Sequence, residues 1–529
     1  MSHSRPCVFA LPWLWLPIAI VLAPMLAAQE PETAAASAEE PDDPILSQAL
    51  TPWRGDLDGI LKRGMLRVAI PYGLTTYFMD GADQRGLTYD SVMAFEPFLK
   101  KRLGREAGHL TLVILPTNRA RLLPMLTEGL ADLAAGTITV TEERRALVDF
   151  SEPIHTKIRE VLVIGPAAPE VRTAEDMLAS AVYLRRSTSF FEHLTALNAQ
   201  RVAAGKAPYP VVEVDEHLTD DDLIEMVGAG IIPATIADEP AALLFAQVFD
   251  KVRVRDDLVL ASDQHIAWAM RQDSPQLKAV VNAYIADARK GTTLGNILLT
   301  RYLKNAEWAK NALAPEDRER FNEVVGLLKI YAGKYDFDWL MIAAQGYQES
   351  RLDQSKRSPV GAVGVMQVMP ATARDPNVGI PEIHLQEPNI HAGVKYLRLL
   401  RDRYFNDPAL SALDQTLFSF AAYNAGPGNI AKARKRAATL GLDPDVWLDN
   451  VEIAAAKVVS REPVVYVRNV YKYYVAYKLL SEGKVGDRRR DHPDTRDDCR
   501  DQDGIAGQDK RDCKQEGRRE RATDEGDQD

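Results

Sequence analysis

The sequence predicts a multidomain protein in which a two-lobed α/β domain is followed by a mainly α-helical domain. The chain has 529 residues, a length that usually corresponds to two or three domains. Residues 53–304 alternate short apolar runs with segments of helical spacing, which is typical of an α/β sheet. Residues 336–480 have helical spacing almost throughout, so we expect a separate helical domain there.

The composition is that of an ordinary globular protein and argues against two classes of protein. Hydrophobic residues make up 46% of the chain and charged residues 26%. The formal net charge of −11 argues against a nucleic-acid partner, which would call for a basic stripe. The three cysteines, Cys7, Cys499 and Cys513, lie outside the predicted domains, so no disulfide framework is expected.

Residues 1–28 have the pattern of an export signal. Arg5 precedes an uncharged, mostly apolar run that ends in small residues suited to cleavage. The run is also close to membrane-spanning length, so a retained N-terminal anchor stays open as the alternative. Residues 29–52 are rich in Ala, Glu, Pro and Asp, and this composition predicts a disordered linker.

Apolar runs of strand length occur in both halves of the α/β segment. They are residues 66–70, 110–115, 161–164, 181–184 and 235–238. Helical spacing separates them in the first half, at residues 88–103 and 119–129. The alternation predicts a mainly parallel sheet, and its repetition predicts two lobes.

The most specific pattern of this domain is GLADLAAGTITVTEER at residues 129–144, followed by DFSEP at residues 149–153. Together with GLTYD at residues 86–90, it resembles the periplasmic amino-acid-binding proteins of ABC importers, which have the family-3 solute-binding fold. The resemblance implies a two-lobed, periplasmic-binding-protein-like domain over residues 53–304 that binds a small amino-acid-like or muropeptide ligand.

The same resemblance implies ligand-binding residues. Hydroxyls matching Thr137 and Thr139, and a guanidinium matching Arg144, hold the ligand's carboxylate in that family. A guanidinium fork matches a carboxylate bidentately, so the assignment is physically sound. Asp238, at the end of a predicted strand, is the candidate partner of the ligand's ammonium. The alternative is that Arg144 pairs with a neighbouring glutamate on a surface turn.

Residues 305–335 are predicted to connect the two domains, with a helix at residues 315–331 that either caps the first domain or opens the second. Asp336 is the expected N-cap of the next helix, residues 337–348. Further helices of the second domain are expected from apolar residues at helical spacing. They are residues 390–404, 411–423, 451–459 and 466–480.

The chemistry of the second domain is predicted to centre on Glu349, which ends an apolar, aromatic-containing helix. Burial of such a carboxyl raises its pKa, so the group can stay protonated near neutral pH and act as a general acid. Short motifs follow at fixed distances. They are Glu349-Ser350, SPVGAVGVMQVMP at residues 358–370, AAYNAG at residues 421–426, and Glu462 with Tyr466-Val467.

Taken together, these motifs resemble the Slt-type lytic transglycosylases, which share a goose-lysozyme-like helical fold. With the first domain included, the chain resembles the F-type membrane-bound lytic murein transglycosylases. The resemblance implies that Glu349 is the single acid/base catalyst. It would protonate the glycosidic oxygen between N-acetylmuramic acid and N-acetylglucosamine and then take a proton from the muramoyl 6-hydroxyl, which closes a 1,6-anhydro ring.

The resemblance also implies a set of substrate-binding residues. They are Ser358, Gln367, Met369, Tyr423, Asn424, Glu462 and Tyr466. Pro463 stands where the family commonly has Thr, which puts the local geometry of Glu462 in question. One carboxylate is sufficient for this chemistry because the substrate's own hydroxyl is the nucleophile, whereas typical hydrolases need two carboxyls. We expect peptidoglycan as the partner and no metal or cofactor.

Two other functions stay open at this point. A lysozyme-type hydrolase would follow if Asp353 or another acid positions a water molecule. A catalytically inactive cell-wall or solute sensor is the other alternative, although the intact motif set argues against it. The expected location is the periplasm, peripheral to the outer membrane of a Gram-negative bacterium.

Residues 481–529 form the last predicted segment. They are packed with Asp, Arg and Lys and nearly lack apolar residues, so we expect a disordered tail. The sequence does not settle whether Cys499 and Cys513 form a disulfide or remain thiols.

Overall fold

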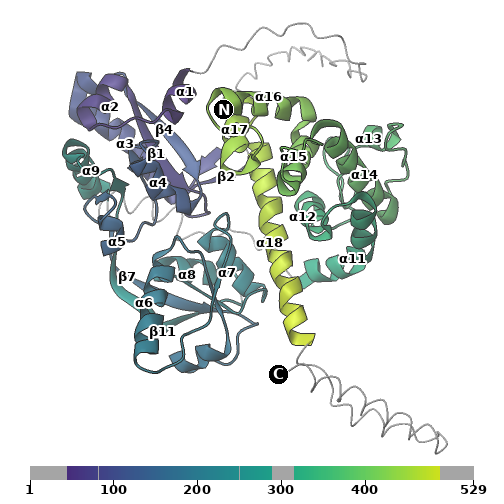
Figure 1. Ribbon diagram of the computed structural model, residues 1–529, viewed down its shortest axis with the longest axis horizontal. Coiled ribbons are helices and arrows are strands. Elements are labelled where there is room, and N and C mark those ends of the chain that lie inside the picture. The colour runs from purple at the N-terminus through teal and green to yellow at the C-terminus, as the bar shows by residue number, and fades with distance from the viewer. Residues whose placement is uncertain (1–43, 81–82, 250, 289–314, 489–529) are drawn as a thin grey trace, which may run out of the picture. The chain divides into compact units, whose positions relative to one another are not determined.

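The computed structural model describes residues 44–80, 83–249, 251–288 and 315–488 (Figure 1). The predicted export signal, residues 1–28, lies outside the described residues, as do residues 29–43 of the predicted linker and residues 489–529 of the predicted tail. The described part of the chain confirms a two-lobed α/β domain followed by a mainly helical domain.

The first lobe is a five-stranded sheet in the order β4-β1-β5-β12-β6. The strands are β1 (Met65–Pro71), β4 (Thr111–Thr117), β5 (Leu133–Ala134), β6 (Asp149–Phe150) and β12 (Ala269–Met270). All seven residues of β1 are buried, and β1 runs parallel to β4 and β5 on either side. The helices of this lobe are α2 (Leu57–Arg63), α3 (Leu87–Leu103), α4 (Leu122–Thr127), α5 (Glu142–Arg145) and α9 (Pro275–Ala288).

The second lobe has its own five-stranded sheet, in the order β11-β7-β10-β8-β9. The strands are β7 (His155–Ile164), β8 (Val182–Leu184), β9 (Val211–Glu213), β10 (Ala234–Asp238) and β11 (Arg253–Ile266). The helices are α6 (Ser189–Ala203), α7 (Asp220–Gly228) and α8 (Glu239–Ala246). Strand β7 is antiparallel to both β10 and β11, so this sheet is mixed rather than mainly parallel as predicted.

The second domain packs its helices around one core. They are α11 (Pro315–Tyr335), α12 (Trp339–Ser350), α13 (Pro370–Arg374), α14 (Gln386–Tyr404), α15 (Ala412–Ala425), α16 (Pro427–Thr439), α17 (Glu452–Val458) and α18 (Glu462–Arg488). Helix α12 lies along α18, where the rings of Tyr347 and Tyr473 meet edge to face with centroids 4.7 Å apart. Glu349, the predicted catalytic residue, lies near the end of α12.

Helix α11 packs in the core of the second domain, so of the two expected roles it opens this domain and does not cap the first. Val324, Leu328 and Ala332 are fully buried in the core of the helical domain. The expected cap of the following helix is wrong by two residues. Asp338, not Asp336, accepts a hydrogen bond from the amide of Leu340 at 2.9 Å.

The predicted disordered linker is wrong over its last residues, because residues 44–50 form helix α1 (Pro44–Leu50). The physical reason is a buried cation. Arg67, fully buried in β1, is paired with Asp132 and also donates hydrogen bonds to the carbonyl oxygens of Ala49, Thr51 and Trp53. A buried guanidinium requires hydrogen-bond acceptors, and these carbonyl oxygens supply them. The segment that precedes the first domain is held in place by these bonds.

Helix α18 is shared between the two domains. Its first half packs in the core of the helical domain, whereas Val475, Ala476 and Leu479 pack against the core of the second lobe. The helix continues to Arg488, so the predicted disorder is wrong for residues 481–488. No helix in the described ranges is both long and apolar enough to cross a membrane.

Candidate functional site

Glu349 lies near the C-terminal end of α12, where Arg351 adopts a left-handed backbone conformation and stops the helix. The side chain is partly buried, and its Oε1 accepts a hydrogen bond from the Tyr466 hydroxyl at 2.6 Å. Burial raises the pKa of Glu349 to about 7, against the opposing effect of the Tyr466 hydrogen bond. Oε2 makes no hydrogen bond with any described residue.

Tyr466 reaches Glu349 because α12 and α18 lie side by side. Its ring is buried, and burial together with the neighbouring Glu349 raises the pKa of its hydroxyl well above the usual range. The hydroxyl therefore stays protonated and acts only as a donor to the carboxyl group. Tyr423, on α15, is the third member of this cluster, since burial and the Glu349 carboxyl both raise its pKa.

The segment that follows Glu349 is held by buried polar side chains. Asn389 on α14 is fully buried, accepts from the Met366 amide at 2.9 Å and donates to the Val363 carbonyl at 2.7 Å. The Tyr423 hydroxyl donates to the Met366 carbonyl at 2.7 Å. Ser350 donates to the Val365 carbonyl at 2.8 Å. These bonds fix the segment directly beside Glu349.

Gly364 is required by this packing. Its φ of +77° is a left-handed conformation that favours glycine, and a Cβ atom there would lie 2.5 Å from the Gln354 side chain. Gln354 in turn accepts a hydrogen bond from the Val365 amide at 3.1 Å. Gly361 also has a left-handed φ, of +95°, but a Cβ atom there would meet open space, so close packing requires glycine only at Gly364.

The remaining predicted substrate residues fall into two groups. Ser358 and Gln367 are engaged within their own loop. Ser358 Oγ accepts from the Ala362 amide at 2.9 Å, and the Gln367 side-chain amide donates to the Gly364 carbonyl at 2.8 Å. The second group is exposed and consists of Met369, Asn424 and Glu462. Pro463, the departure from the family pattern, is the second residue of α18, where proline fits a helix's first turn.

Sequence reasoning missed two residues of this site. Asn389 is one, and Gln345 is the other. Gln345 lies one helical turn before Glu349, is fully buried, and its amide makes no hydrogen bond within the described part of the chain. It nevertheless lies close enough to Tyr466 to lower the pKa of that hydroxyl, against larger effects in the other direction. The sequence contains one signal for Gln345: it lies four residues before Glu349, which places both side chains on one helix face.

The predicted ligand-binding residues of the first domain lie between the two lobes. Arg144 is buried, and its guanidinium already forms an ion pair with a carboxylate of the protein itself. Nε donates to Glu192 on α6 at 2.9 Å, and another nitrogen donates to the Ser187 carbonyl at 3.0 Å. Thr139 accepts from the Ser189 hydroxyl at 3.0 Å. Arg144 therefore does not pair with the neighbouring glutamates of its own turn, and its bonds join the lobes.

Two buried acceptors near this junction lack donors among the described residues. They are Oε2 of Glu192 and Oδ1 of Asp238. Burial, with the nearby Glu160, raises the pKa of Asp238 to about 7. Thr137 accepts from Arg119 at 3.2 Å, and burial lowers the pKa of this arginine to about 10. The junction therefore combines buried cations with carboxylates that have unused hydrogen-bonding capacity.

Comparison with known families matches both halves of the chain. Residues 75–304 match the family of bacterial extracellular solute-binding proteins, family 3, and residues 326–444 match the transglycosylase SLT domain. A protein named membrane-bound lytic murein transglycosylase F from Desulfosudis oleivorans is 27% identical over 404 residues, which is 74% of this chain and 83% of the relative. One with the same name from Saccharophagus degradans is 28% identical and covers 79% of this chain and 78% of its own length.

Among solved structures, an ancestral arginine-binding protein bound to arginine matches with 20% identity and a TM-score of 0.37. The match covers 45% of this chain and 98% of that protein.

Proposed function

We propose that this chain, whose residues 326–444 match the transglycosylase SLT domain and whose residues 75–304 match the family 3 solute-binding proteins, cleaves peptidoglycan as a lytic transglycosylase. The observation that carries the proposal is Glu349, a partly buried carboxyl with a pKa of about 7 that receives a 2.6 Å hydrogen bond from Tyr466. A carboxyl with such a pKa holds its proton in a useful fraction of molecules at neutral pH and can also give it up.

The first step is protonation of the glycosidic oxygen. Tyr466 occupies Oε1 of Glu349, so the acidic proton is carried on Oε2. This proton goes to the oxygen between N-acetylmuramic acid and N-acetylglucosamine as the bond from that oxygen to C1 breaks. In the second step the same carboxylate accepts the proton of the muramoyl 6-hydroxyl, and the oxygen of that hydroxyl attacks C1. The ring closes as a 1,6-anhydro sugar, and Glu349 regains its proton.

A lyase is favoured over a hydrolase because Asp353 is engaged elsewhere. Its carboxylate accepts from the Ser355 hydroxyl at 2.7 Å and from the Ser355 amide at 2.8 Å. These hydrogen bonds lower the pKa of Asp353. No carboxylate among the described residues contributes to the raised pKa of Glu349. A hydrolase needs a second carboxyl to activate water or attack the sugar.

The substrate-binding roles of the neighbouring residues form part of the proposal. Ser358 orients the N-acetyl group, and Gln367 and Met369 line the sugar subsites. Tyr466 holds the catalytic carboxyl, and Tyr423 fixes the Met366 backbone beside it. Asn424 and Glu462, both exposed, complete the substrate contacts.

Substitution of Glu349 tests the catalytic assignment. Glu349→Gln is nearly isosteric but cannot deliver a proton, so cleavage of purified sacculi should fall by at least about 10²-fold. Glycan binding and the circular dichroism spectrum should stay unchanged. Glu323→Gln, at an exposed position of α11 with no role in the site, is the matched control and should keep its activity. Retention of more than about a tenth of the activity by Glu349→Gln would move the catalytic role to another residue.

The first domain is proposed to bind a small ligand with a carboxylate and an ammonium, either an amino acid or a peptidoglycan stem fragment, and thereby to regulate cleavage. The ligand's carboxylate takes the place of Glu192 on Arg144, with Thr137 and Thr139 beside it. The unused Oδ1 of Asp238 receives the ammonium. A buried acceptor without a donor is costly, which supports a ligand that supplies one.

Calorimetry against amino acids and muropeptides tests this part of the proposal. Arg144→Ala should abolish binding. Glu192→Gln removes the internal competitor while keeping the shape of the side chain, so it should bind the ligand more tightly than the wild type. Equal affinity in wild type and Arg144→Ala would rule out this pocket. Failure of every ligand to bind would leave the domain a structural role.

We also propose that the protein acts in the periplasm, peripheral to the outer membrane. Peptidoglycan lies in the cell envelope, and the relatives are named membrane-bound. Fractionation of cells with an antibody against the chain should place it with the envelope, and recovery in the cytoplasmic fraction alone would contradict this location.

A further inference from the structure

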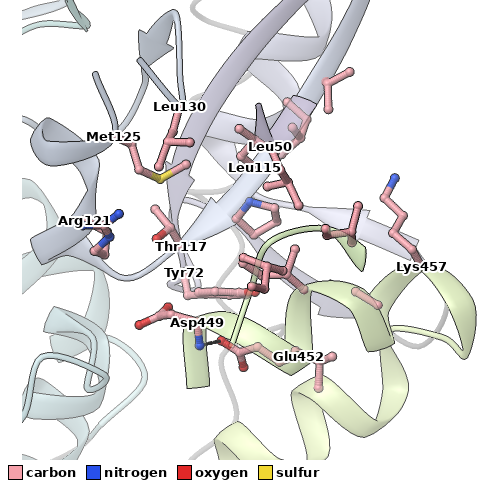
Figure 2. Close-up of a pocket in the computed structure, with 18 of the residues that line it drawn as sticks. Leu50, Tyr72, Leu115, Thr117, Arg121, Met125, Leu130, Asp449, Glu452 and Lys457 are labelled. Carbon is pink, nitrogen blue, oxygen red and sulfur yellow. Dashed lines mark hydrogen bonds between the residues drawn. The ribbon is translucent and has the colours of Figure 1, made fainter. Parts of the chain in front are cut away.

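A cavity of about 420 Å³ lies between the first lobe and the helical domain, and neither Glu349 nor Arg144 is among the residues that line it (Figure 2). One wall comes from the first lobe and includes Tyr72 and Leu115. The other comes from α17 and the residues around it and includes Ile453 and Val464. The volume is in the range of small-molecule sites.

The lining of this cavity is mainly apolar. It includes side chains of Leu, Ile, Val, Met and Tyr from segments far apart in the chain. The two acids in the wall are already used. Glu452 accepts from Arg468 at 3.1 Å, and Asp449 accepts from Asn118 at 2.6 Å and from His217 at 3.2 Å. The cavity therefore presents an apolar surface without a free carboxylate.

Positive charge in the wall is not fully compensated. Arg461 donates to the Gln84 side chain at 2.8 Å and lies over the Tyr77 ring, but it forms no ion pair within the described ranges. Lys457, four residues earlier, is an exposed lining residue that also has no acidic partner among the described residues. Arg121 differs, because it is paired with Glu128 at 2.8 Å. Figure 2 shows Arg121 and Lys457 on opposite sides of the pocket, with Tyr72 and Leu115 between them.

From this arrangement we propose that the cavity binds an amphiphile with one flexible apolar chain and a single anionic head of carboxylate or phosphate oxygens. The chain lies against the leucine, isoleucine, valine and methionine side chains, and Arg461 with Lys457 binds the head. A guanidinium and an ammonium without counter-ions beside an apolar wall fit such a molecule. A sugar fits poorly, since its hydroxyls would lack partners on that surface.

Calorimetry with the purified full-length chain tests the proposal. The probes are octanoate, decanoate and dodecanoate, with decanol as the neutral probe and decyltrimethylammonium as the cationic one. Affinity should rise roughly fourfold for each added CH₂ group. Decanoate should bind at least about tenfold more tightly than decanol, since the cations contribute charge-assisted hydrogen bonds. Decyltrimethylammonium should bind more weakly than either.

Two variants assign the binding to this cavity. Arg461→Gln should reduce the preference for decanoate over decanol to about threefold or less, whereas Arg121→Gln, the matched control whose cation is already paired, should leave it unchanged. Ala456→Trp fills the cavity and should abolish binding of all chains. Sacculus cleavage and thermal unfolding confirm that each variant is folded.

The source of the ligand is distinguished by a further pair of probes. Tighter binding of dodecanoate than of lysophosphatidate identifies a free fatty acid, and the reverse order identifies a phospholipid headgroup. Equal affinity for decanoate and decanol, or binding unaffected by Ala456→Trp, would overturn the proposal.

Discussion

At the scale of single residues, the chemistry depends on the environment of Glu349. Because burial holds its pKa near 7, the folded protein binds a proton between about pH 4.5 and 7 that the unfolded chain has released. This group therefore destabilises the fold as pH rises through that window, and its contribution is constant below it. The cost at pH 8 is roughly 3 kcal/mol by the size of the shift.

The first prediction concerns this pH dependence. Cleavage should fall as pH rises through about 7, since the acid form of Glu349 is lost. Glu349→Gln cannot ionise, so its stability relative to the wild type should increase between pH 5 and pH 8. Urea unfolding of both proteins at the two pH values measures this difference. An equal stability difference at both pH values would show that Glu349 titrates normally.

A second residue-scale prediction concerns Asn389. Asn389→Ala leaves the Met366 amide and the Val363 carbonyl without a partner, so it should cost at least about 2 kcal/mol of stability. Activity should fall as well, since the segment beside Glu349 loosens. Asn424→Ala, at an exposed position, is the control and should leave the urea midpoint within error. An unchanged midpoint for Asn389→Ala would contradict this account of the loop.

At the scale of elements, α18 carries Tyr466, the hydrogen-bond partner of the proposed catalytic carboxyl of Glu349. Tyr466→Phe removes a hydrogen bond that lowers the pKa of Glu349, so the alkaline limb of the pH–rate profile should move to higher pH. A merely structural tyrosine would change the rate without moving the profile. The reference is Tyr473→Phe, on the same helix, whose ring contacts Tyr347 rather than Glu349.

Helix α11 gives a second element-scale prediction. A fragment of residues 315–488 should fold as a cooperative helical domain, whereas residues 336–480 should be much less stable. The shorter fragment lacks the fully buried Val324, Leu328 and Ala332. Thermal unfolding followed by circular dichroism compares the two. Equal melting temperatures would show that α11 does not stabilise the helical domain and only connects it to the first domain.

Most of the elements could be predicted from periodicity. In β1, α3 and α14, for example, apolar residues recur along the element and are buried in the structure. Helix α1 could not be predicted, since carbonyl contacts with the distant Arg67 hold the residues around it. The same limit applies to the sites. The family motifs include Glu349, Tyr423 and Tyr466, which lie together in the structure. Nothing in the local sequence indicates that the guanidinium of Arg144 forms an ion pair with Glu192.

At the scale of the whole molecule, polar contacts join the helical domain to both lobes. Asp449, at a backbone φ of +58°, accepts from Asn118 of the first lobe and from His217 of the second. Tyr471 on α18 donates to Asp215 at 2.8 Å. Tyr466 lies on the same helix, so a continuous series of contacts connects the two lobes to Glu349.

His217 makes this junction sensitive to pH. Burial lowers its pKa, but the hydrogen bonds that His217 donates to Asp215 and Asp449 outweigh burial and raise the pKa to about 9. The resulting stabilisation is fully present below about pH 6.5 and is lost as pH rises through 9. Asp449→Asn should therefore reduce the melting temperature more at pH 6 than at pH 10. An equal reduction at both values would show that the charge of His217 does not contribute.

The central claim is that one buried carboxyl cleaves the glycan without water, and the products test it most directly. Mass spectrometry of the fragments released from purified sacculi by the wild type should show 1,6-anhydro ends, with Glu349→Gln releasing almost none. Solvent enriched in ¹⁸O should leave no label in the products. Labelled reducing ends from the wild type would contradict the lyase mechanism.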